Sequence, residues 1–250
     1  MTESTNMNSS KEVLNIIVER LKSEDFLNDF EYHISSKAFV YKTPGEKLIV
    51  ELDPYTTDYL ISCDGDKPTV KDIPKSIVIR PCISRRFEII HRWYEKFSFR
   101  SLRDQRYSDS IGFASDMLGF DGRYFFHLDL LNFEEQYNKV VHVIKDMCSF
   151  MNSFFRNLEQ LYYYKIVLVM EGKRNFPDGG AEWLFRDLAL TKIVSPNDYP
   201  IVKSKALEHI EIMHNRHEPN IERYYPNKLF EIFNYLERYN FKYNESNRAK

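Results

Sequence analysis

The chain has 250 residues, and its 35 lysines and arginines nearly balance 37 aspartates and glutamates, which leaves a formal net charge of −2. It holds 8 glycines and 10 prolines, about 7% of the residues against about 12% in average proteins, while aromatic residues make up 15%. Such a composition is not typical of disordered, collagen-like or linker proteins. It predicts a globular protein, long enough to bury a core without disulfides or a structural metal.

Cysteine usage and the N-terminus indicate the compartment. Cys63, Cys82 and Cys148 are three in number, widely separated, and include no C-x-x-C pair. This argues against a disulfide framework and against a thiolate zinc site. Residues 1–10 lack the apolar stretch of a secretion signal, and the longest apolar run, 166–170, is too short to cross a bilayer. We therefore expect a cytoplasmic protein that does not enter a membrane.

Hydrophobic periodicity predicts an α+β fold: an N-terminal helix, an antiparallel sheet packed with long helices, and an all-helical C-terminal part. Residues 1–9 are expected to form a disordered tail. Ser9 and Glu12 form a capping-box pattern at the start of an amphipathic helix over 10–23. The other elements expected before residue 132 are strands over 47–53, 58–63, 76–80 and 123–131, a turn over 63–68, a helix over 83–97 and a loop over 98–110. The strand over 58–63 is expected to pair with 47–53, whose Leu48, Val50 and Leu52 share one face.

Helical patterns dominate the second half. Asn132 and Glu135 form a second capping box before a long apolar pattern that extends to Leu158. Residues 162–170 are ambiguous, because their Val and Ile content suits a strand whereas their position before Gly172 suits a helix end. Further helices are expected over 181–193, 201–214 and 226–239. The pattern predicts an α+β domain over 10–155 and a helical region over 156–250, with a single continuous domain as the alternative.

The order of these elements carries a family resemblance. A leading helix precedes strands around 39–41 and 48–50, and a later strand leads into the Phe133-Glu-Glu helix, which ends in Phe154-Phe-Arg-Asn-Leu-Glu-Gln-Leu161. Over residues 11–171 this order resembles small uncharacterised bacterial α+β domains that occur among toxin-immunity proteins. The resemblance implies a non-enzymatic protein that binds a partner protein, and it favours a helix over 156–171. It supplies no catalytic residue.

A basic segment is the main candidate for binding. Between Lys75 and Arg106 stand nine basic residues against three acidic ones, interleaved with aromatic rings. Arginine forks bind carboxylates and phosphates, and tryptophan and arginine dominate binding hot spots. The expected partner contacts are Arg85, Arg86, Arg92, Trp93, Arg100 and Arg103. The alternative interpretation is a solvated surface whose charge is cancelled by acidic neighbours in space.

Three weaker patterns could carry chemistry. Glu171-Gly-Lys173 follows an apolar run and, with Asp121 or Asp53, is similar to the D…E-x-K core of metal-dependent nucleases, provided that 166–170 is a strand. His127 and Asp129 would share a strand face with Arg123, as an acid–base pair or as a surface salt bridge. The third pattern is the group His209, His214 and His217, in which the first two diverge on a helix and favour an exposed helix end over a metal site.

Several enzyme classes lack their motifs. The chain has no G-x-G-x-x-G, no G-x-x-x-x-G-K-[ST] and no G-x-S-x-G. Cys148 lies on the apolar face of a predicted helix, where a thiol normally fills the core. We therefore expect a cofactor-free, non-catalytic bacterial protein that binds a protein partner and acts in immunity or defence. An acidic protein suits the basic segment as partner, and nucleic acid is the less favoured partner. The alternatives are a metal-dependent nuclease using Asp121, Glu171 and Lys173, and a structural protein that oligomerises through its C-terminal helices.

Overall fold

The computed structural model describes residues 8–64, 67–176 and 180–241, with the side chains of 62–64, 67, 68, 103 and 107 outside the description. The chain divides into two compact units. Unit 1 comprises residues 1–85 and 112–152, and unit 2 comprises residues 86–111 and 153–250. The segment 86–111, which the sequence pattern places in the α+β domain, thus belongs to unit 2. Most of the predicted tail, 1–7, lies outside the described residues, whereas the backbone N–H of Asn8 donates to the carbonyl of Leu128 at 3.1 Å.

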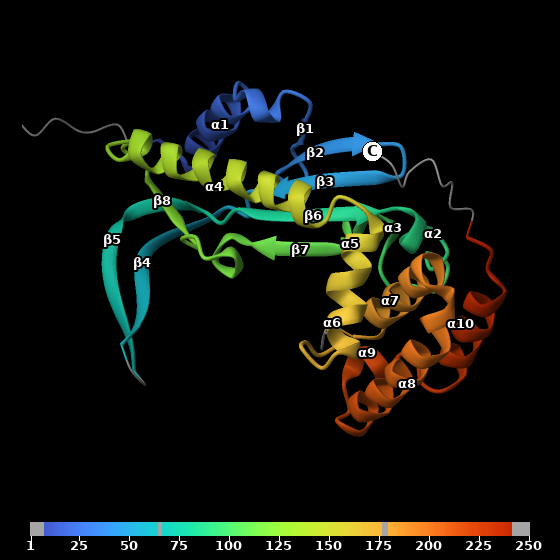
Figure 1. Ribbon diagram of the computed structural model, residues 1–250. Coiled ribbons are helices and arrows are strands. Elements are labelled where there is room, and N and C mark those ends of the chain that lie inside the picture. The colour runs from blue at the N-terminus through green and yellow to red at the C-terminus, as the bar shows by residue number, and fades with distance from the viewer. Residues whose placement is uncertain (1–7, 65–66, 177–179, 242–250) are drawn as a thin grey trace, which may run out of the picture. The chain divides into compact units, whose positions relative to one another are not determined.

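The predicted α+β fold is confirmed, with an N-terminal helix, antiparallel sheets and a helical C-terminal part (Figure 1). The elements that build unit 1 are α1 (Ser10–Leu21), β1 (Glu31–His33), β2 (Ala38–Thr43), β3 (Glu46–Glu51), β4 (Tyr55–Asp64), β5 (Lys67–Ile79), β6 (Cys82–Phe87), β7 (Ile111–Ala114), β8 (Tyr124–His127) and α4 (Phe133–Phe154). The chain passes into unit 2 within β6, after Arg85, and returns within β7, before Gly112.

The strands form two sheets, and one predicted pairing is wrong. Among the described residues, a five-stranded sheet has the order β1-β2-β3-β6-β7 and a three-stranded sheet has the order β4-β5-β8. The strand after Pro54 does not return along β3. It pairs antiparallel with the 13-residue β5, from Tyr55 opposite Val78 to Asp64 opposite Lys67. Strand β3 pairs with β2 instead, so the predicted strand over 76–80 is the end of a much longer hairpin arm.

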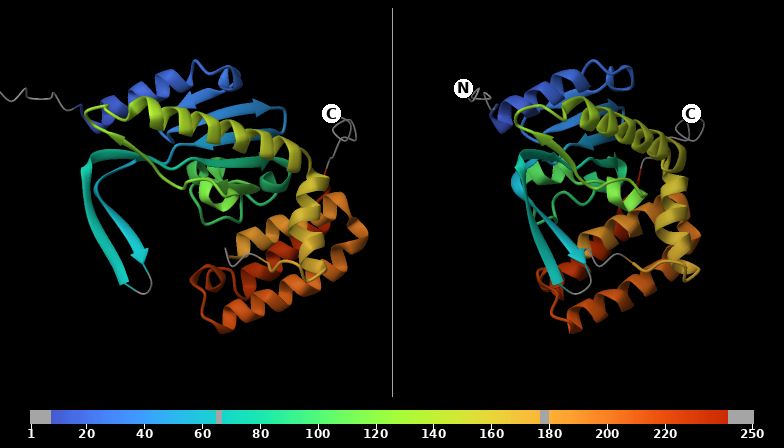
Figure 2. Two further views of the ribbon diagram at one scale, coloured as in Figure 1. Left: turned by 60° about the vertical axis from the view of Figure 1, so that its left-hand side comes forward. Right: turned by 90° about the vertical axis from the view of Figure 1, so that its left-hand side faces the viewer.

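Helices α1 and α4 lie on the same side of the strands of unit 1 (Figure 2). The predicted capping box is present, since the backbone N–H of Ser9 donates to the Glu12 carboxylate at 2.6 Å and Ser9 Oγ accepts from the Glu12 N–H at 3.2 Å. The two helices are joined by an ion pair between Arg20 and Glu134 at 2.5 Å. Apolar side chains from both helices, including Ile17 and Ile144, are fully buried, as the helical spacing predicted.

Strand β3 is buried on both faces rather than on one. Leu48 and Val50 are buried, as predicted, but Ile49 between them is only 1% exposed. Ile49 joins Ala38 and Val40 in a small cluster on the opposite face. Leu48, Ile49 and Val50 form a continuous apolar run, which is typical of a strand that is buried on both faces.

Unit 2 is built from helices. They are α2 (Ile89–Arg92), α3 (Leu102–Tyr107), α5 (Leu158–Tyr162), α6 (Leu168–Met170), α7 (Ala181–Val194), α8 (Tyr199–Asn215), α9 (Pro219–Glu222) and α10 (Asn227–Arg238). The three predicted C-terminal helices correspond to α7, α8 and α10. The predicted helix over 83–97 is wrong in its first part, where the chain forms β6, and the predicted loop over 98–110 contains α3.

The ambiguous segment 162–170 is helical. Helix α5 continues through a π-helical turn, Tyr163–Val167, into α6. The helix end before Gly172, whose φ is +70°, is therefore the correct interpretation of the sequence pattern. Within the described ranges, no helix combines the length and the apolar character needed to cross a membrane.

Cys148 allows a simple check of the unit 1 core. Its side chain lies on the inner face of α4, and burial raises the pKa of the thiol to about 12. Because only the thiolate reacts, we expect iodoacetamide at pH 8 to leave Cys148 unmodified in the folded protein, with a thiolate fraction of ~10⁻⁴. In urea the same residue should alkylate fully, as judged by peptide mass spectrometry. Equal modification in the two conditions would contradict this packing.

Candidate functional site

Three of the six predicted partner contacts, Arg85, Arg86 and Trp93, are buried. Arg85, at the end of the unit 1 part of β6, is 6% exposed, and its Nη2 donates to Asn152 Oδ1 at 2.6 Å. Arg86 is 2% exposed. Its Nε and Nη2 bind the two carboxylate oxygens of Glu88 at 3.0 and 3.1 Å, and its Nη1 donates to the carbonyls of Gln105 and Ser108 at 2.6 and 2.8 Å. Arg86 therefore clamps the end of β6 to α3.

Trp93 is also an internal residue. It is 2% exposed, its Nε1 donates to the carbonyl of Ile90 at 3.1 Å, and its ring packs edge-on against Tyr94. Arg85, Arg86 and Trp93 are thus not available to a partner at the surface, which corrects the sequence interpretation. Of the other predicted contacts, Arg92 and Arg100 are exposed, and the side chain of Arg103 lies outside the described residues.

The nuclease alternative requires a strand over 166–170, but this segment is helical. Glu171 and Lys173 follow the helical turn α6, and they pair with each other at 2.7 Å with side chains 44% and 65% exposed. Asp121 belongs to unit 1, and Asp53 is paired with Arg80 at 2.9 Å. In the part of the chain that the structure describes, no group of three or more His, Cys, Asp or Glu side chains is placed to hold a metal ion.

The predicted histidine patterns do not converge. His209 packs against Phe176 with ring centroids 5.7 Å apart. His214 instead pairs with Glu222 at 2.8 Å and stacks on Tyr225 at 3.8 Å. The predicted strand over 123–131 is shorter in the structure, since β8 ends at His127, and Asp129 in the turn that follows accepts a hydrogen bond from the backbone N–H of Leu131 at 3.0 Å. These contacts fit ordinary surface and helix-end roles.

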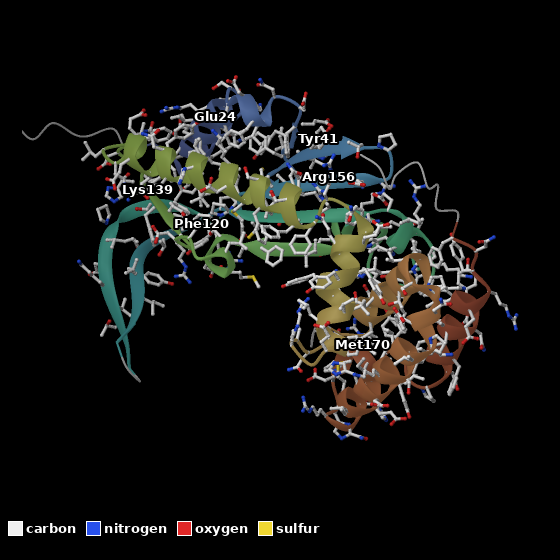
Figure 3. All side chains as sticks on the ribbon, viewed as in Figure 1. Glu24, Tyr41, Phe120, Lys139, Arg156 and Met170 are labelled. Atoms are coloured by element: carbon white, nitrogen blue, oxygen red, sulfur yellow. The ribbon has the colours of Figure 1, made fainter. Side chains whose placement is uncertain are left out.

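A site that the sequence analysis missed lies on the β4–β5 hairpin of unit 1. The hairpin curves away from the helices of this unit, and Figure 3 shows its side chains standing out from the ribbon. A cavity of about 300 Å³ lies along β4. The side chains that define its character are Tyr55, Tyr59, Ile61, Arg80, Arg123 and Phe125. The cavity thus combines aromatic and aliphatic walls with two guanidinium groups.

Strand β4 is an open edge. It bonds to β5 on one side only, and no other strand among the described residues pairs with it. Proteins usually protect such edges with Lys or Pro, and β5 carries both, but the 10-residue β4 has neither. The register places Tyr59 and Ile61 on one face with Val70, and these side chains are 49%, 49% and 66% exposed. An edge of this length, free of Lys and Pro and with exposed apolar side chains on one face, can serve as a template for a further strand.

The charge of the cavity is positive. Arg80 forms an ion pair with Asp53. Arg123 is exposed and forms no ion pair or hydrogen bond with any described residue. No carboxylate belongs to the described cavity lining. Thr57 Oγ1 closes the bulge in β4 by accepting from the N–H of Tyr59 at 3.2 Å, so the bend that shapes the cavity is held locally.

Residues 55–64 contain no Lys or Pro, and this is the sequence feature that points to the site. It indicates an open edge only once the structure shows that β4 is an edge strand. Arg123, which was predicted to lie on a strand, directly precedes β8, and it lines the same cavity as the aromatic residues of β4. The chain matches no family model, no curated protein and no solved structure.

Proposed function

We propose that this protein is a non-catalytic binding factor that captures an extended, acidic segment of a partner protein along the free edge of β4. The observation that carries the proposal is the long edge strand β4, which has no Lys or Pro and exposes Tyr59 and Ile61 beside a cavity with two arginines. In strand addition, backbone hydrogen bonds supply affinity, and pockets for alternate side chains supply specificity.

The cavity defines the chemistry of the partner segment. Tyr55, Tyr59 and Phe125 offer an apolar wall for one side chain of the added strand. Arg123, which has no described carboxylate partner, offers a fork for an Asp or Glu side chain. A segment with alternating apolar and acidic residues fits both requirements, and it agrees with the acidic partner expected from the sequence.

Two other occupants fit less well. A second copy of the chain, paired edge to edge, would bring its own Arg80 and Arg123 toward the same groove, and like charges in such an interface are unfavourable. Nucleic acid would meet a protein whose formal net charge is −2, without the basic excess of a typical nucleic-acid binder. A partner protein is therefore the occupant that we propose.

We further propose a role in bacterial immunity or defence, in which the captured segment belongs to a toxin. The support is the resemblance of residues 11–171 to domains that occur among toxin-immunity proteins. Co-expression with a toxin encoded by a neighbouring gene tests this role. We expect the chain to protect the host cell, and we expect Tyr59→Lys to abolish this protection. If the Tyr59→Lys variant still protects the cell, the edge of β4 is not required for immunity.

Peptide selection tests the binding function directly. A display library of random peptides selected on the full-length protein is expected to enrich sequences without Pro that alternate apolar and acidic residues. Fluorescence anisotropy of one enriched peptide should show at least ~10-fold weaker binding to Tyr59→Lys and to Arg123→Glu, about 1.4 kcal/mol or more. Ile34→Lys, at an 83% exposed apolar residue of the same unit, is the matched control and should bind normally.

Two outcomes would contradict the proposal. Enriched peptides that bind wild-type protein and Tyr59→Lys equally would remove the edge of β4 as the docking site. Light scattering that shows a dimer of the wild-type protein and a monomer of Tyr59→Lys would identify a second copy of the chain as the occupant instead.

A further inference from the structure

Unit 2 contains a second, smaller cavity that is unrelated to the hairpin. It has a volume of about 90 Å³ and lies between the segment after α2, the start of α7 and the end of α9. The residues that set its chemistry are Phe99, Arg100, Glu182, Asn220, Arg223 and Tyr224. Arg100 is one of the two predicted partner contacts that the structure leaves exposed.

The only carboxylate in the described lining is already neutralised. Glu182 Oε1 accepts hydrogen bonds from Ser98 Oγ at 3.0 Å and from the Tyr224 hydroxyl at 2.9 Å. Its Oε2 pairs with Arg100 Nε at 3.2 Å. This contact anchors the guanidinium of Arg100 through one nitrogen, and its two Nη groups form no hydrogen bond with the described residues.

Further donors surround the cavity. Arg223 and Asn220 are exposed, and neither side chain has a hydrogen bond or ion pair to a described residue. Lys228 Nζ lies 3.9 Å from the ring centroid of Phe99, which adds a third cation nearby. Since Glu182 balances only one of these positive charges, the cavity has an excess of positive charge and of N–H donors.

One wall is aromatic. The ring of Phe99 is 48% exposed and packs 4.8 Å from that of Tyr224. Gly180 also lines the cavity, and it suits this position because its φ is +99° and a Cβ there would approach Asn220 Cβ to 3.0 Å. The cavity lining therefore combines cationic side chains with an exposed aromatic ring.

We propose that this cavity binds an oxyanion, a carboxylate or a phosphate monoester, carried by an aromatic group. The forks of Arg100 and Arg223 match the oxygens of either anion, and the amide of Asn220 supplies a neutral donor. The aromatic group stacks on Phe99. The site is independent of the hairpin, because it lies wholly within unit 2.

Calorimetric titration of the full-length protein with benzoate, phenyl phosphate and inorganic phosphate tests this site. We expect saturable binding of at least one aryl anion, tighter than that of inorganic phosphate, and the tighter of benzoate and phenyl phosphate identifies the anion. Arg223→Gln should weaken it by about 10-fold, as expected for the loss of one charge-assisted fork. Arg92→Gln, at an exposed arginine of the same unit, is the matched control and should leave the affinity unchanged.

The proposal is overturned if no anion binds in the millimolar range, or if Arg223→Gln and Arg92→Gln weaken binding equally, which would indicate general charge attraction. Binding of inorganic phosphate as tight as that of the aryl anions would remove the role of Phe99. Unchanged tryptophan fluorescence confirms that Arg223→Gln is folded, because both tryptophans, Trp93 and Trp183, belong to unit 2.

Discussion

Lys165→Met is expected to destabilise unit 2 by about 3–5 kcal/mol, the usual cost of removing one partner of a buried ion pair. Lys165 lies in the π-helical turn and is 3% exposed, and its Nζ is 2.5 Å from Oδ1 of Asp187, which is 1% exposed. Burial lowers the pKa of Lys165 and raises that of Asp187, and the attraction between the two charges opposes both shifts. Without Lys165, the carboxylate would remain buried with no cation bound to it.

The measurement is urea unfolding followed by tryptophan fluorescence, which reports on unit 2 because both tryptophans lie there. Asp187→Leu alone should cost a similar amount, since it leaves the ammonium group unpaired. The double variant Lys165→Met, Asp187→Leu should recover most of the loss, because an apolar pair needs no compensation in a buried position. If the double variant loses as much free energy of unfolding as the two single variants together, the two side chains do not act as a pair.

Arg86→Met is expected to destabilise the same unit by about 3–5 kcal/mol. The substitution would leave Glu88 without its bidentate partner and remove the donor to the carbonyls of Gln105 and Ser108. Arg86→Lys keeps the charge but lacks the planar fork, so we expect it to recover less than half of the loss.

The same unfolding measurement checks Arg86. Arg92→Met is the matched control, because Arg92 is exposed, and it should change the free energy of unfolding by less than about 0.5 kcal/mol. Similar losses for Arg86→Met and Arg92→Met would contradict the assignment of Arg86 as an internal clamp.

The buried arginines also explain why the basic segment misled the sequence interpretation. Its excess of positive charge is compensated within the units by carboxylates and by backbone carbonyls. Arg86 binds Glu88 and donates to the carbonyls of Gln105 and Ser108, and Arg100 pairs with Glu182. Carbonyl acceptors carry no formal charge, so a count of acidic residues cannot include them. The candidate for partner binding is instead the β4–β5 hairpin, where Tyr59, Ile61 and Val70 are exposed on one face.

The long helices were predictable because their signals are local. A capping box marks the start of α1, and the apolar spacing of α1 and of α4 lies within the residues of each helix. At the second predicted box, Asn132 Oδ1 accepts from the backbone N–H of His127 at 3.0 Å, and Glu135 pairs with Lys139 instead. The same argument holds for α7, α8 and α10, whose ends lie within two residues of the predicted ones. The helical state of 162–170 was decided by contacts such as that of Lys165 with Asp187, which are distant in the sequence.

Strand partners were not predictable in the same way. Residues 82–87 have the apolar spacing of a helix, yet they form β6 because an extended segment there completes a sheet with β3 and β7. The exposed edge of β4 follows from its pairing with β5, and no feature of residues 55–64 alone shows which strand would lie beside them.

By itself, the amino-acid sequence determined the α+β class, the positions of the long helices and the absence of several enzyme motifs, because each depends on composition or on residues close along the chain. Only the tertiary structure decided which strands pair, which arginines are buried and where open surfaces remain. These properties depend on burial and hydrogen bonding between residues far apart in the sequence. Both proposed binding sites, on the β4 edge and beside Arg223, belong to this second group.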